Sequence, residues 1–224
     1  MLNNNGFKVS QKRVARRMKF LGLSSITIKK FNHAGKPKTD DTKKYHNLLE
    51  QDFTTDKPSQ KWVGDITYIY TKETGWTYLA VVMDLFDLKV VGWSYSTRMT
   101  ETLVIDAFNK ALINRGLAKG GIFHSDRGSQ YTSNDYEELL STLKIRHSYS
   151  KKGYPYDNAS MESFNSILKK EEVNNNTYET FEEAKTVIFE FIESWYNNKR
   201  IHSTLGYITP NQKYQNYITN LVTA

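Results

Sequence analysis

Three consecutive segments between residues 62 and 96 constrain the fold of this chain more than any other feature. They are rich in Val, Ile, Thr, Tyr and Trp, which favour extended backbone. The segments 62–70, 76–83 and 88–96 have the usual length of strands, and only a few residues separate each from the next. Because short connections join antiparallel neighbours, the sequence predicts a three-stranded antiparallel meander.

Helical and extended patterns alternate after this meander. Residues 104–112 carry apolar side chains at the spacing of one buried helix face, and the helix is expected to end near Gly116. A short strand at 121–124, a helix around 136–143 and a strand at 145–149 are expected next. Each of these segments is bounded by glycine or by polar residues, as the ends of short elements usually are.

Two further helices complete the predicted order. The first spans about residues 158–171, and the second opens with a capping box at Thr180. The predicted buried face of the second helix comprises Phe181, Ala184, Ile188, Phe191, Ile192 and Trp195. The order βββαβαβα predicts an α/β chain with a mixed five-stranded sheet flanked by helices, which is the layout of ribonuclease H-like folds.

The N-terminal part of the chain is strongly basic. The first 50 residues hold twelve Lys or Arg against three Asp or Glu, whereas the remainder holds 19 against 21. Residues 10–21 form the pattern of a short basic helix with Ser10 as N-cap and Gly22 as its stop. The candidate DNA contacts on this helix are Arg13, Arg16 and Arg17. Such an arm favours a phosphate backbone as partner, and a solvated basic surface that aids solubility is the alternative.

Composition excludes several classes of protein. The chain has no cysteine, so disulfides and cysteine-bearing zinc sites are excluded. No apolar run approaches the length needed to span a bilayer, and residues 1–6 lack the layout of a secretory signal. We therefore expect a cytoplasmic protein with no membrane partner, in which oxygen or histidine ligands hold any metal.

Three carboxylates carry the predicted chemistry. Asp65 lies in a strand that is apolar on both faces, Asp126 follows a strand end, and Glu162 lies on a helix with an apolar opposite face. Each has an ordinary alternative: a capping role for Asp65, a turn or an ion pair with Arg127 for Asp126, and a solvated surface for Glu162. Taken together, three such groups from distant segments predict a site for two hard divalent cations and phosphoryl transfer on nucleic acid.

One helix is predicted to bring a carboxylate and an ammonium group to the same side. Asn158, Glu162, Asn165 and Lys169 follow a four, three, four spacing and so share one polar face. The carboxylate suits a metal and the ammonium suits a phosphate. The candidate DNA contacts of this region are Lys169, Arg127, Lys151, Lys152 and Asn158. A plain surface role is the alternative for each of them.

Four stretches of the chain carry a family resemblance. They are Gly-Asp-Ile-Thr-Tyr at 64–68, His-Ser-Asp-Arg-Gly-Ser-Gln-Tyr at 124–131, the segment 156–164, and Leu-Gly-Tyr-Ile-Thr-Pro at 205–210. Together they resemble the integrase core of bacterial insertion-sequence transposases of family three, within the Asp-Asp-Glu superfamily. The 35 residues between Asp126 and Glu162 match the spacing of that family.

The resemblance implies a function and a domain order. Asp65, Asp126 and Glu162 are implied to be the catalytic triad that binds two Mg²⁺ or Mn²⁺ ions. Residues 1–33 would be a partial helix-turn-helix DNA-binding segment, 34–57 a basic linker, and 58–217 the integrase catalytic core. The expected activity is cleavage of element ends and joining of the 3′-hydroxyl to target DNA. The expected partners are the terminal inverted repeats, target DNA, further copies of the chain, and a fusion or partner from an upstream reading frame.

Other functions fit parts of the same sequence. A repurposed DNA-binding relic would keep the triad without activity, and a structure-specific nuclease would cut DNA without strand transfer. A tyrosine recombinase would act without metal through a phosphotyrosyl adduct. Activity in EDTA would indicate the recombinase, and product analysis separates the nuclease from a transposase.

Overall fold

The computed structural model describes residues 6–24, 45–152 and 154–223. The chain divides into two compact units, Met1–His33 and Ala34–Ala224. The smaller unit contains helix α1 (Gln11–Phe20). The larger unit contains β1 (Lys61–Thr71), β2 (Gly75–Asp84), β3 (Val90–Ser96), α2 (Glu101–Asn114), β4 (Ile122–Ser125), α3 (Asn134–Thr142), β5 (Arg146–Tyr149), α4 (Ala159–Glu171), α5 (Phe181–Phe189) and α6 (Pro210–Thr223), with short 3₁₀ turns between them.

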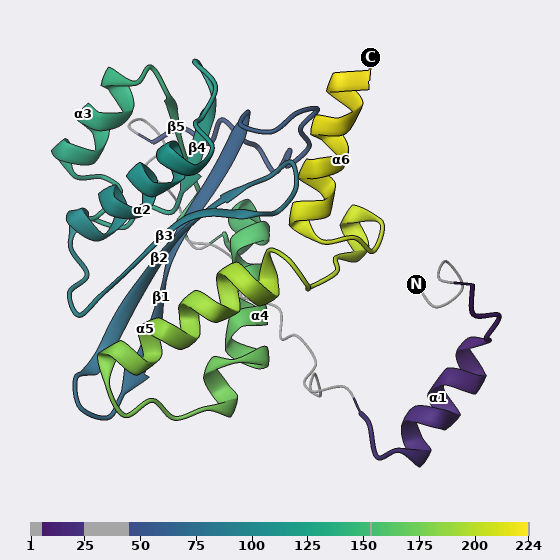
Figure 1. Cartoon of the computed structure of the whole chain (residues 1–224). Coiled ribbons are helices and arrows are strands. Elements are labelled where there is room, and N and C mark those ends of the chain that lie inside the picture. The colour runs from purple at the N-terminus through teal and green to yellow at the C-terminus, as the bar shows by residue number, and fades with distance from the viewer. Residues whose placement is uncertain (1–5, 25–44, 153, 224) are drawn as a thin grey trace. The chain divides into compact units, whose positions relative to one another are not determined.

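The five strands form one mixed sheet in the order β3-β2-β1-β4-β5 (Figure 1). β1, β2 and β3 are antiparallel neighbours, so the predicted meander is confirmed. β4 runs parallel to β1, and β5 runs parallel to β4. The predicted mixed five-stranded sheet is therefore confirmed, and β1 is its central strand.

Helices cover both faces of this sheet. α4 and α5 lie on one side, where Val63 and Ile69 of β1 join a core with Phe164 and Leu168 of α4. α2 and α3 lie on the other side, where Trp62 belongs to a second core. Because successive side chains of a strand point to opposite faces, each position of β1 is assigned to one of these two cores.

One glycine allows α2 to approach the sheet closely. A Cβ atom at Gly92 of β3 would lie 2.3 Å from the carbonyl oxygen of Ala107 and 2.5 Å from the backbone nitrogen of Ala111. Real side chains do not tolerate such distances. The absence of a side chain at Gly92 therefore sets the spacing between α2 and β3.

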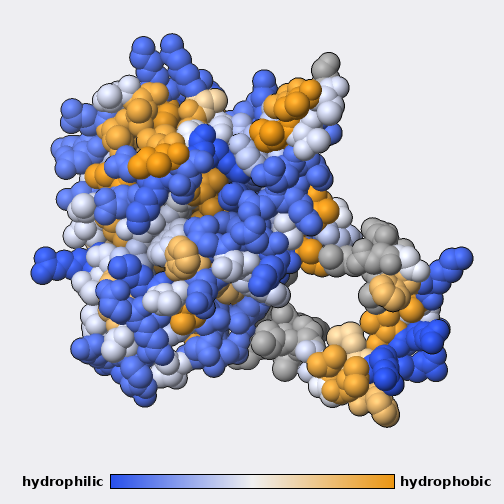
Figure 2. Space-filling model, viewed as in Figure 1, coloured by the Kyte–Doolittle hydropathy of each residue, from blue (hydrophilic) through white to orange (hydrophobic). Residues whose placement is uncertain are grey.

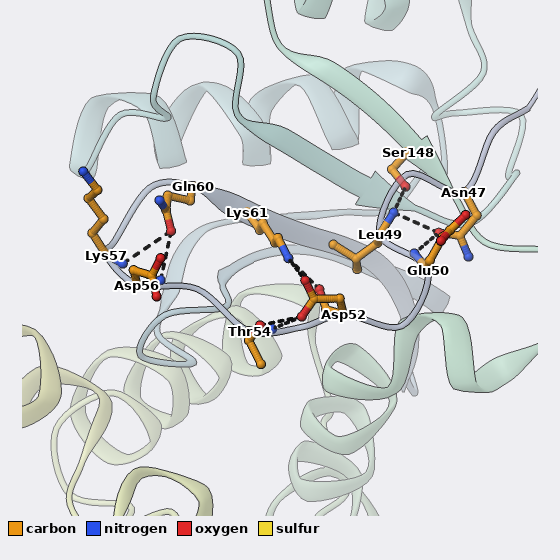
Figure 3. A network of polar contacts seen from close by, with 10 residues as sticks. All are labelled: Asn47, Leu49, Glu50, Asp52, Thr54, Asp56, Lys57, Gln60, Lys61 and Ser148. Carbon is orange, nitrogen blue, oxygen red and sulfur yellow. Dashed lines mark hydrogen bonds and ion pairs between the residues drawn. The ribbon is translucent and has the colours of Figure 1, made fainter.

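The end of the predicted linker lies against the larger unit. Of the predicted linker 34–57, only residues 45–57 are described; there the backbone N–H groups of Leu48 and Leu49 donate to Ser148 Oγ of β5 (Figure 3). Lys61 Nζ donates to the backbone oxygen and the carboxylate of Asp52, and Leu49 is buried. A hydrogen bond from the backbone N–H of Asp52 to the carbonyl of Leu49 closes a turn in this segment. Side-chain anchoring explains why this polar segment is ordered.

The last predicted helix differs from expectation at its end. α5 continues into a π-helix (Glu190–Tyr196), which has more residues per turn than an α-helix. The wider turns shift the buried stripe by one position, so that Tyr196 is buried and Trp195 is 45% exposed. The expectation that Trp195 is buried was therefore wrong, because it assumed regular α-helical spacing.

Helix α1 begins and ends as its sequence predicts. The Ser10 hydroxyl accepts a hydrogen bond from the backbone N–H of Arg13, and Gly22 adopts a positive φ of 68° just beyond the helix. The described residues of α1 include none that is buried. Figure 2 shows apolar and basic groups side by side on the surface of this helix.

Helix α6 was not predicted. Its Tyr214 ring covers the guanidinium group of Arg115 at 4.1 Å, and that guanidinium pairs with the buried carboxylates of Asp84 and Asp87. These contacts tie α6 to the ends of β2 and α2. In the described ranges no helix is long and apolar enough to cross a membrane.

Candidate active site

Asp65 lies in the middle of β1, on the face that α4 covers. It is partly buried, and Asn165 of α4 donates a hydrogen bond from Nδ2 to Asp65 Oδ2 at 2.8 Å. Burial, and then the negative charges of Asp126 and Glu162, raise the pKa of Asp65 to about 7. The hydrogen bonds from the Ile66 backbone and from Asn165 act in the opposite direction but are outweighed. The surroundings of Asp65 thus contain too little positive charge to keep the pKa of its carboxyl group at the usual value.

Asp126 follows Ser125, the last residue of β4. Because β4 is parallel to β1 and adjacent to it, the chain emerges beside the strand that carries Asp65. The Asp126 side chain is exposed, and its Oδ1 accepts a hydrogen bond from the Gly128 backbone N–H at 2.9 Å. This is the local turn that was named as the ordinary alternative for Asp126, and it fixes the carboxylate near Asp65.

Glu162 lies in the first turn of α4. The opposite face of α4 is buried through Met161, Phe164 and Leu168, so the orientation of Glu162 is set by core packing. Glu162 is partly exposed, and burial raises its pKa. Its charge also raises the pKa of Asp65, which places the two side chains on the same side of the protein.

A second glycine holds the strands of the site close together. A Cβ atom at Gly64 would lie 2.5 Å from the Phe123 ring of β4. The Gly64 carbonyl accepts a hydrogen bond from Asn158 Nδ2 at 3.3 Å. The position next to Asp65 is therefore tied both to β4, which leads to Asp126, and to the start of α4, which carries Glu162.

Asn158 needs a correction as a DNA contact. Its side chain is 7% exposed, and its amide nitrogen contacts the Gly64 carbonyl. A buried side chain offers little surface to a phosphate, so we assign Asn158 to the internal support of the site. The helix spacing predicted that Asn158 lies on the same face as Glu162, but spacing alone does not show how deeply a side chain is buried.

The three carboxylates supply the oxygen ligands that hard divalent cations prefer. Among the described residues, no three His, Asp or Glu side chains lie close enough to form a metal-binding group. Asp126 is also held by the Gly128 amide. Carboxylate oxygens of this kind fit Mg²⁺ or Mn²⁺ by the chemistry of the donor atoms.

The predicted phosphate contacts differ in their surroundings. Lys169 lies two turns after Glu162 on α4 and is partly exposed, and in the described parts of the chain it forms no ion pair. Lys151 and Lys152 are exposed. Arg127 donates from Nε to the Ser150 carbonyl at 2.9 Å, so at least part of its guanidinium supports the loop after β5.

Four other arginines have clear surroundings. Arg13, Arg16 and Arg17 are exposed on α1 in the smaller unit. Arg200 pairs with Glu171 at 3.0 Å.

Two histidines of the sheet, His124 and His147, have structural contacts. Both ring nitrogens of His124 contact hydroxyl groups, those of Ser148 and Ser150. Burial lowers the pKa of His124 to about 4, so its ring is neutral at ordinary pH. His147 contacts Glu137 and Ser125.

Two residues of the site were not assigned a role from the sequence. Asn165 is one, because its hydrogen bond to Asp65 depends on the distance between α4 and β1; the spacing placed it on the polar face without showing its partner. Asp157 is the other: its buried carboxylate accepts hydrogen bonds from Gln51 Nε2 and the Lys151 backbone. No local sequence pattern identifies these contacts.

Fold and site together define a protein with an integrase core of the ribonuclease H-like class. The integrase core domain family matches residues 55–155, and a second family of the same description matches 143–210. The chain is 44% identical over 214 residues to the transposase for insertion sequence element IS904 of Lactococcus lactis subsp. lactis (strain IL1403), covering 94% of this chain and 82% of that protein. It is 42% identical over 216 residues to transposase InsF for insertion sequence IS3A of Escherichia coli (strain K12), covering 94% and 73%.

The chain therefore belongs to the family-three insertion-sequence transposases. Solved structures support the same fold. The catalytic core domain of HTLV-2 integrase, solved in complex with magnesium, has a TM-score of 0.55 at 20% identity and covers 72% of this chain and 99% of that one. The simian T-cell lymphotropic virus intasome in complex with a PP2A regulatory subunit gives a TM-score of 0.58 at 20% identity, covering 81% and 60%.

Proposed function

We propose that Asp65, Asp126 and Glu162 form the catalytic, metal-binding site of this transposase. One observation carries the proposal: the hydrogen bond from Asn165 to Asp65 joins α4, which carries Glu162, to β1 beside the end of β4 that leads to Asp126. The charges of Asp126 and Glu162 accordingly raise the pKa of Asp65. Carboxylates that repel one another in this way favour a divalent cation between them. Since a viral integrase core of the same fold was solved with magnesium, we propose two Mg²⁺ or Mn²⁺ ions as the cofactor.

The proposed reaction is the cutting of the element end and the joining of its 3′-hydroxyl to target DNA. When bound, the ions would activate water and stabilise charge on the attacking and leaving oxygens. Asn165 orients Asp65 through its hydrogen bond, and α4 holds Glu162 through its buried face. No covalent protein intermediate is needed, because water and the freed hydroxyl are the nucleophiles.

The proposed substrates are the terminal inverted repeats and the target DNA. Lys169, Lys151 and Lys152 carry positive charge around the carboxylates, and the arginines of α1 supply a separate basic surface. Phosphate contacts of this kind position DNA without reading its sequence. Because two element ends must be brought together, we propose that several copies of the chain act on DNA. A solved structure of the same fold belongs to a viral intasome.

The assay measures Mg²⁺-dependent joining of a labelled element end to target DNA. Asp65→Asn, Asp126→Asn and Glu162→Gln should each abolish joining, because an amide cannot replace a carboxylate as a charged metal ligand. Glu190→Gln changes an exposed carboxylate of the π-helix and should leave joining unchanged. Full activity in any of the three triad variants would refute the assignment.

The same assay separates the remaining alternatives. A nuclease would give cut ends without joined product, and a relic would give neither with the wild-type chain. A melting curve for each variant distinguishes loss of chemistry from loss of folding.

A further inference from the structure

A groove beside the sheet combines exposed aromatic rings with a positive charge. Four aromatic residues of the β1–β2 hairpin line it, together with Lys169 at the end of α4 and a short polar segment that follows α4. We call it the aromatic groove; its aromatic residues are Tyr68, Tyr70, Trp76 and Tyr78. Its volume is about 710 Å³.

The rings are paired but remain open to solvent. Tyr70 lies opposite Trp76 across the two strands, with ring centroids 5.4 Å apart and an angle of 76° between the rings. Tyr68 contacts Trp76 edge to face as well. Tyr70 and Trp76 are nevertheless 53% and 59% exposed. Cross-strand pairing explains why the rings touch, but it does not explain why such large apolar faces remain uncovered.

The hairpin has a free edge at this groove. Among the described residues, β4 pairs with β1 only through positions 61–63, and Tyr178 forms a parallel bridge with Thr71 at the other end, so positions 64–70 have no strand on that side. The segment after α4 passes this edge and contributes Asn174 and Asn176 to the groove. Of the described residues that line the groove, none is acidic. The Asn176 amide donates to the Glu172 carboxylate, whereas Lys169 forms no ion pair in the described parts of the chain. Aromatic faces beside such an ammonium group are the chemistry that binds bases and phosphates.

The groove shares two elements, β1 and α4, with the proposed active site. Lys169 follows Glu162 by seven residues, which is about 10 Å along α4. Tyr68 follows Asp65 by three residues, which is also about 10 Å along β1. Strand alternation puts Tyr68 on the face opposite Asp65, so a DNA strand that leaves the carboxylates would cross the free edge of β1. At about 3.4 Å per stacked nucleotide, the groove begins about three nucleotides from the reacting phosphate.

We infer that the aromatic groove binds unpaired nucleotides of the DNA end, with bases stacked on Tyr70 and Trp76 and a phosphate on Lys169. The inference rests on the proposed function for the identity of the DNA. Stacking on aromatic rings is tolerant of sequence, so the groove would hold a frayed end of any composition. A second copy of the chain is a less suitable occupant, because Lys169 and the amides would lose their hydration without gaining acidic partners.

Binding of single-stranded DNA by the full chain in EDTA tests the inference. The probe is a fluorescein-labelled oligothymidylate of about 12 nucleotides, a length within the range of known single-strand sites, and the readout is anisotropy. Tyr70→Ala and Trp76→Ala should each weaken binding about tenfold, whereas Tyr70→Phe and Trp76→Phe should retain it. Lys169→Gln should lower the slope of log affinity against log salt by about 0.7. Trp195→Ala removes an exposed tryptophan elsewhere and should leave binding unchanged.

Three results would overturn the inference. One is wild-type binding by the Tyr70→Ala, Trp76→Ala double variant. Another is an equal loss on a blunt duplex of the same length, which would show that the rings do not select unpaired bases. The third is a change of oligomeric state in sedimentation with unchanged DNA affinity, which would identify the groove as a protein interface.

The test is separable from that of the proposed function. Binding of the oligonucleotide is measured in EDTA, so it does not depend on metal held by the three carboxylates. If joining proves independent of the three carboxylates while the aromatic variants still lose single-strand binding, the proposed chemistry fails and the groove stands.

Discussion

At the scale of single residues, the uncharged side chain of Asn165 affects both the orientation and the pKa of Asp65. Asn165 neutralises nothing, yet its N–H group is directed at Asp65 and favours the ionised carboxylate. A lysine in the same place would offset the charge and compete with a metal ion. An amide therefore orients the ligand without occupying the role of the cation.

Asn165→Ala should move the pH dependence of DNA joining. Loss of the hydrogen bond raises the pKa of Asp65, so the acidic limb of the pH–rate profile should shift upward by up to about one pH unit. Ser163→Ala, an exposed position on the same helix, should leave the profile in place. A lower rate at every pH with an unshifted limb would show that Asn165 acts on something other than Asp65.

His202 should make the protein less stable in acid. Burial, and then the charge of Arg200, lower the pKa of this histidine from 6.5 to about 4, and its buried Nε2 has no hydrogen-bond partner in the described part of the chain. The unfolded chain thus binds a proton at higher pH than the folded one. The free energy of unfolding should fall as the pH drops from 6.5 to 4, by up to about 3 kcal/mol.

The measurement is urea unfolding of the wild type and of His202→Phe at several pH values. The phenylalanine ring retains the contact with Tyr196 but cannot be protonated. The difference in unfolding free energy between the two proteins should widen below pH 6.5 and level off below pH 4. Parallel curves would contradict the prediction.

At the scale of elements, close packing decides where the functional groups lie. β1 and β4 approach closely at Gly64, and β3 and α2 approach closely at Gly92. The contact at Gly64 holds β4 close to Asp65. The contact at Gly92 holds α2 against the opposite face of the sheet. The catalytic geometry thus depends on two positions that carry no functional group.

Gly92→Ala should destabilise the whole larger unit. The new methyl group would meet the Ala107 carbonyl and the Ala111 nitrogen, which are backbone atoms and cannot rotate away. We expect a loss of about 1–3 kcal/mol, measured by thermal or urea unfolding. Gly120→Ala, where φ is +76° but no atom lies within 4 Å, should cost less. A smaller effect at Gly92 than at Gly120 would show that α2 can move outward freely.

At the scale of the whole molecule, the proposed catalytic site lowers the stability of the folded protein. Three carboxylates from different elements repel one another, and nothing in the described residues supplies a matching positive charge to Asp65. A divalent cation would reverse this repulsion. The folded protein should therefore be stabilised by the ion that it is proposed to use.

Melting temperature should depend on Mg²⁺ in the wild type and not in Asp65→Asn. At a concentration 100 times the dissociation constant, one bound ion adds about 2.7 kcal/mol. In EDTA the order should reverse, with Asp65→Asn melting higher because a poorly solvated charge has been removed. Glu190→Gln serves as the control and should respond like the wild type. An equal response of wild type and Asp65→Asn to Mg²⁺ would exclude Asp65 as a ligand.

Most of the fold was predictable because it follows from local patterns. The meander, the alternating helices and the cap at Ser10 all depend on residues close together in the chain. The errors lie where distant contacts override those patterns. Trp195 is exposed because the helix widens into a π-helix, and α6 forms against the buried Arg115 although its own sequence is only weakly periodic.

The sequence by itself determined the family, the mixed sheet and the identity of three candidate carboxylates, because residue types and spacing are local properties. Only the tertiary structure decided that Asn158 is buried, that Asn165 contacts Asp65, and that the aromatic rings of the hairpin remain exposed. The physical reason is that burial and contact depend on how segments up to a hundred residues apart in the chain approach one another in space. A short stretch of sequence does not determine that approach.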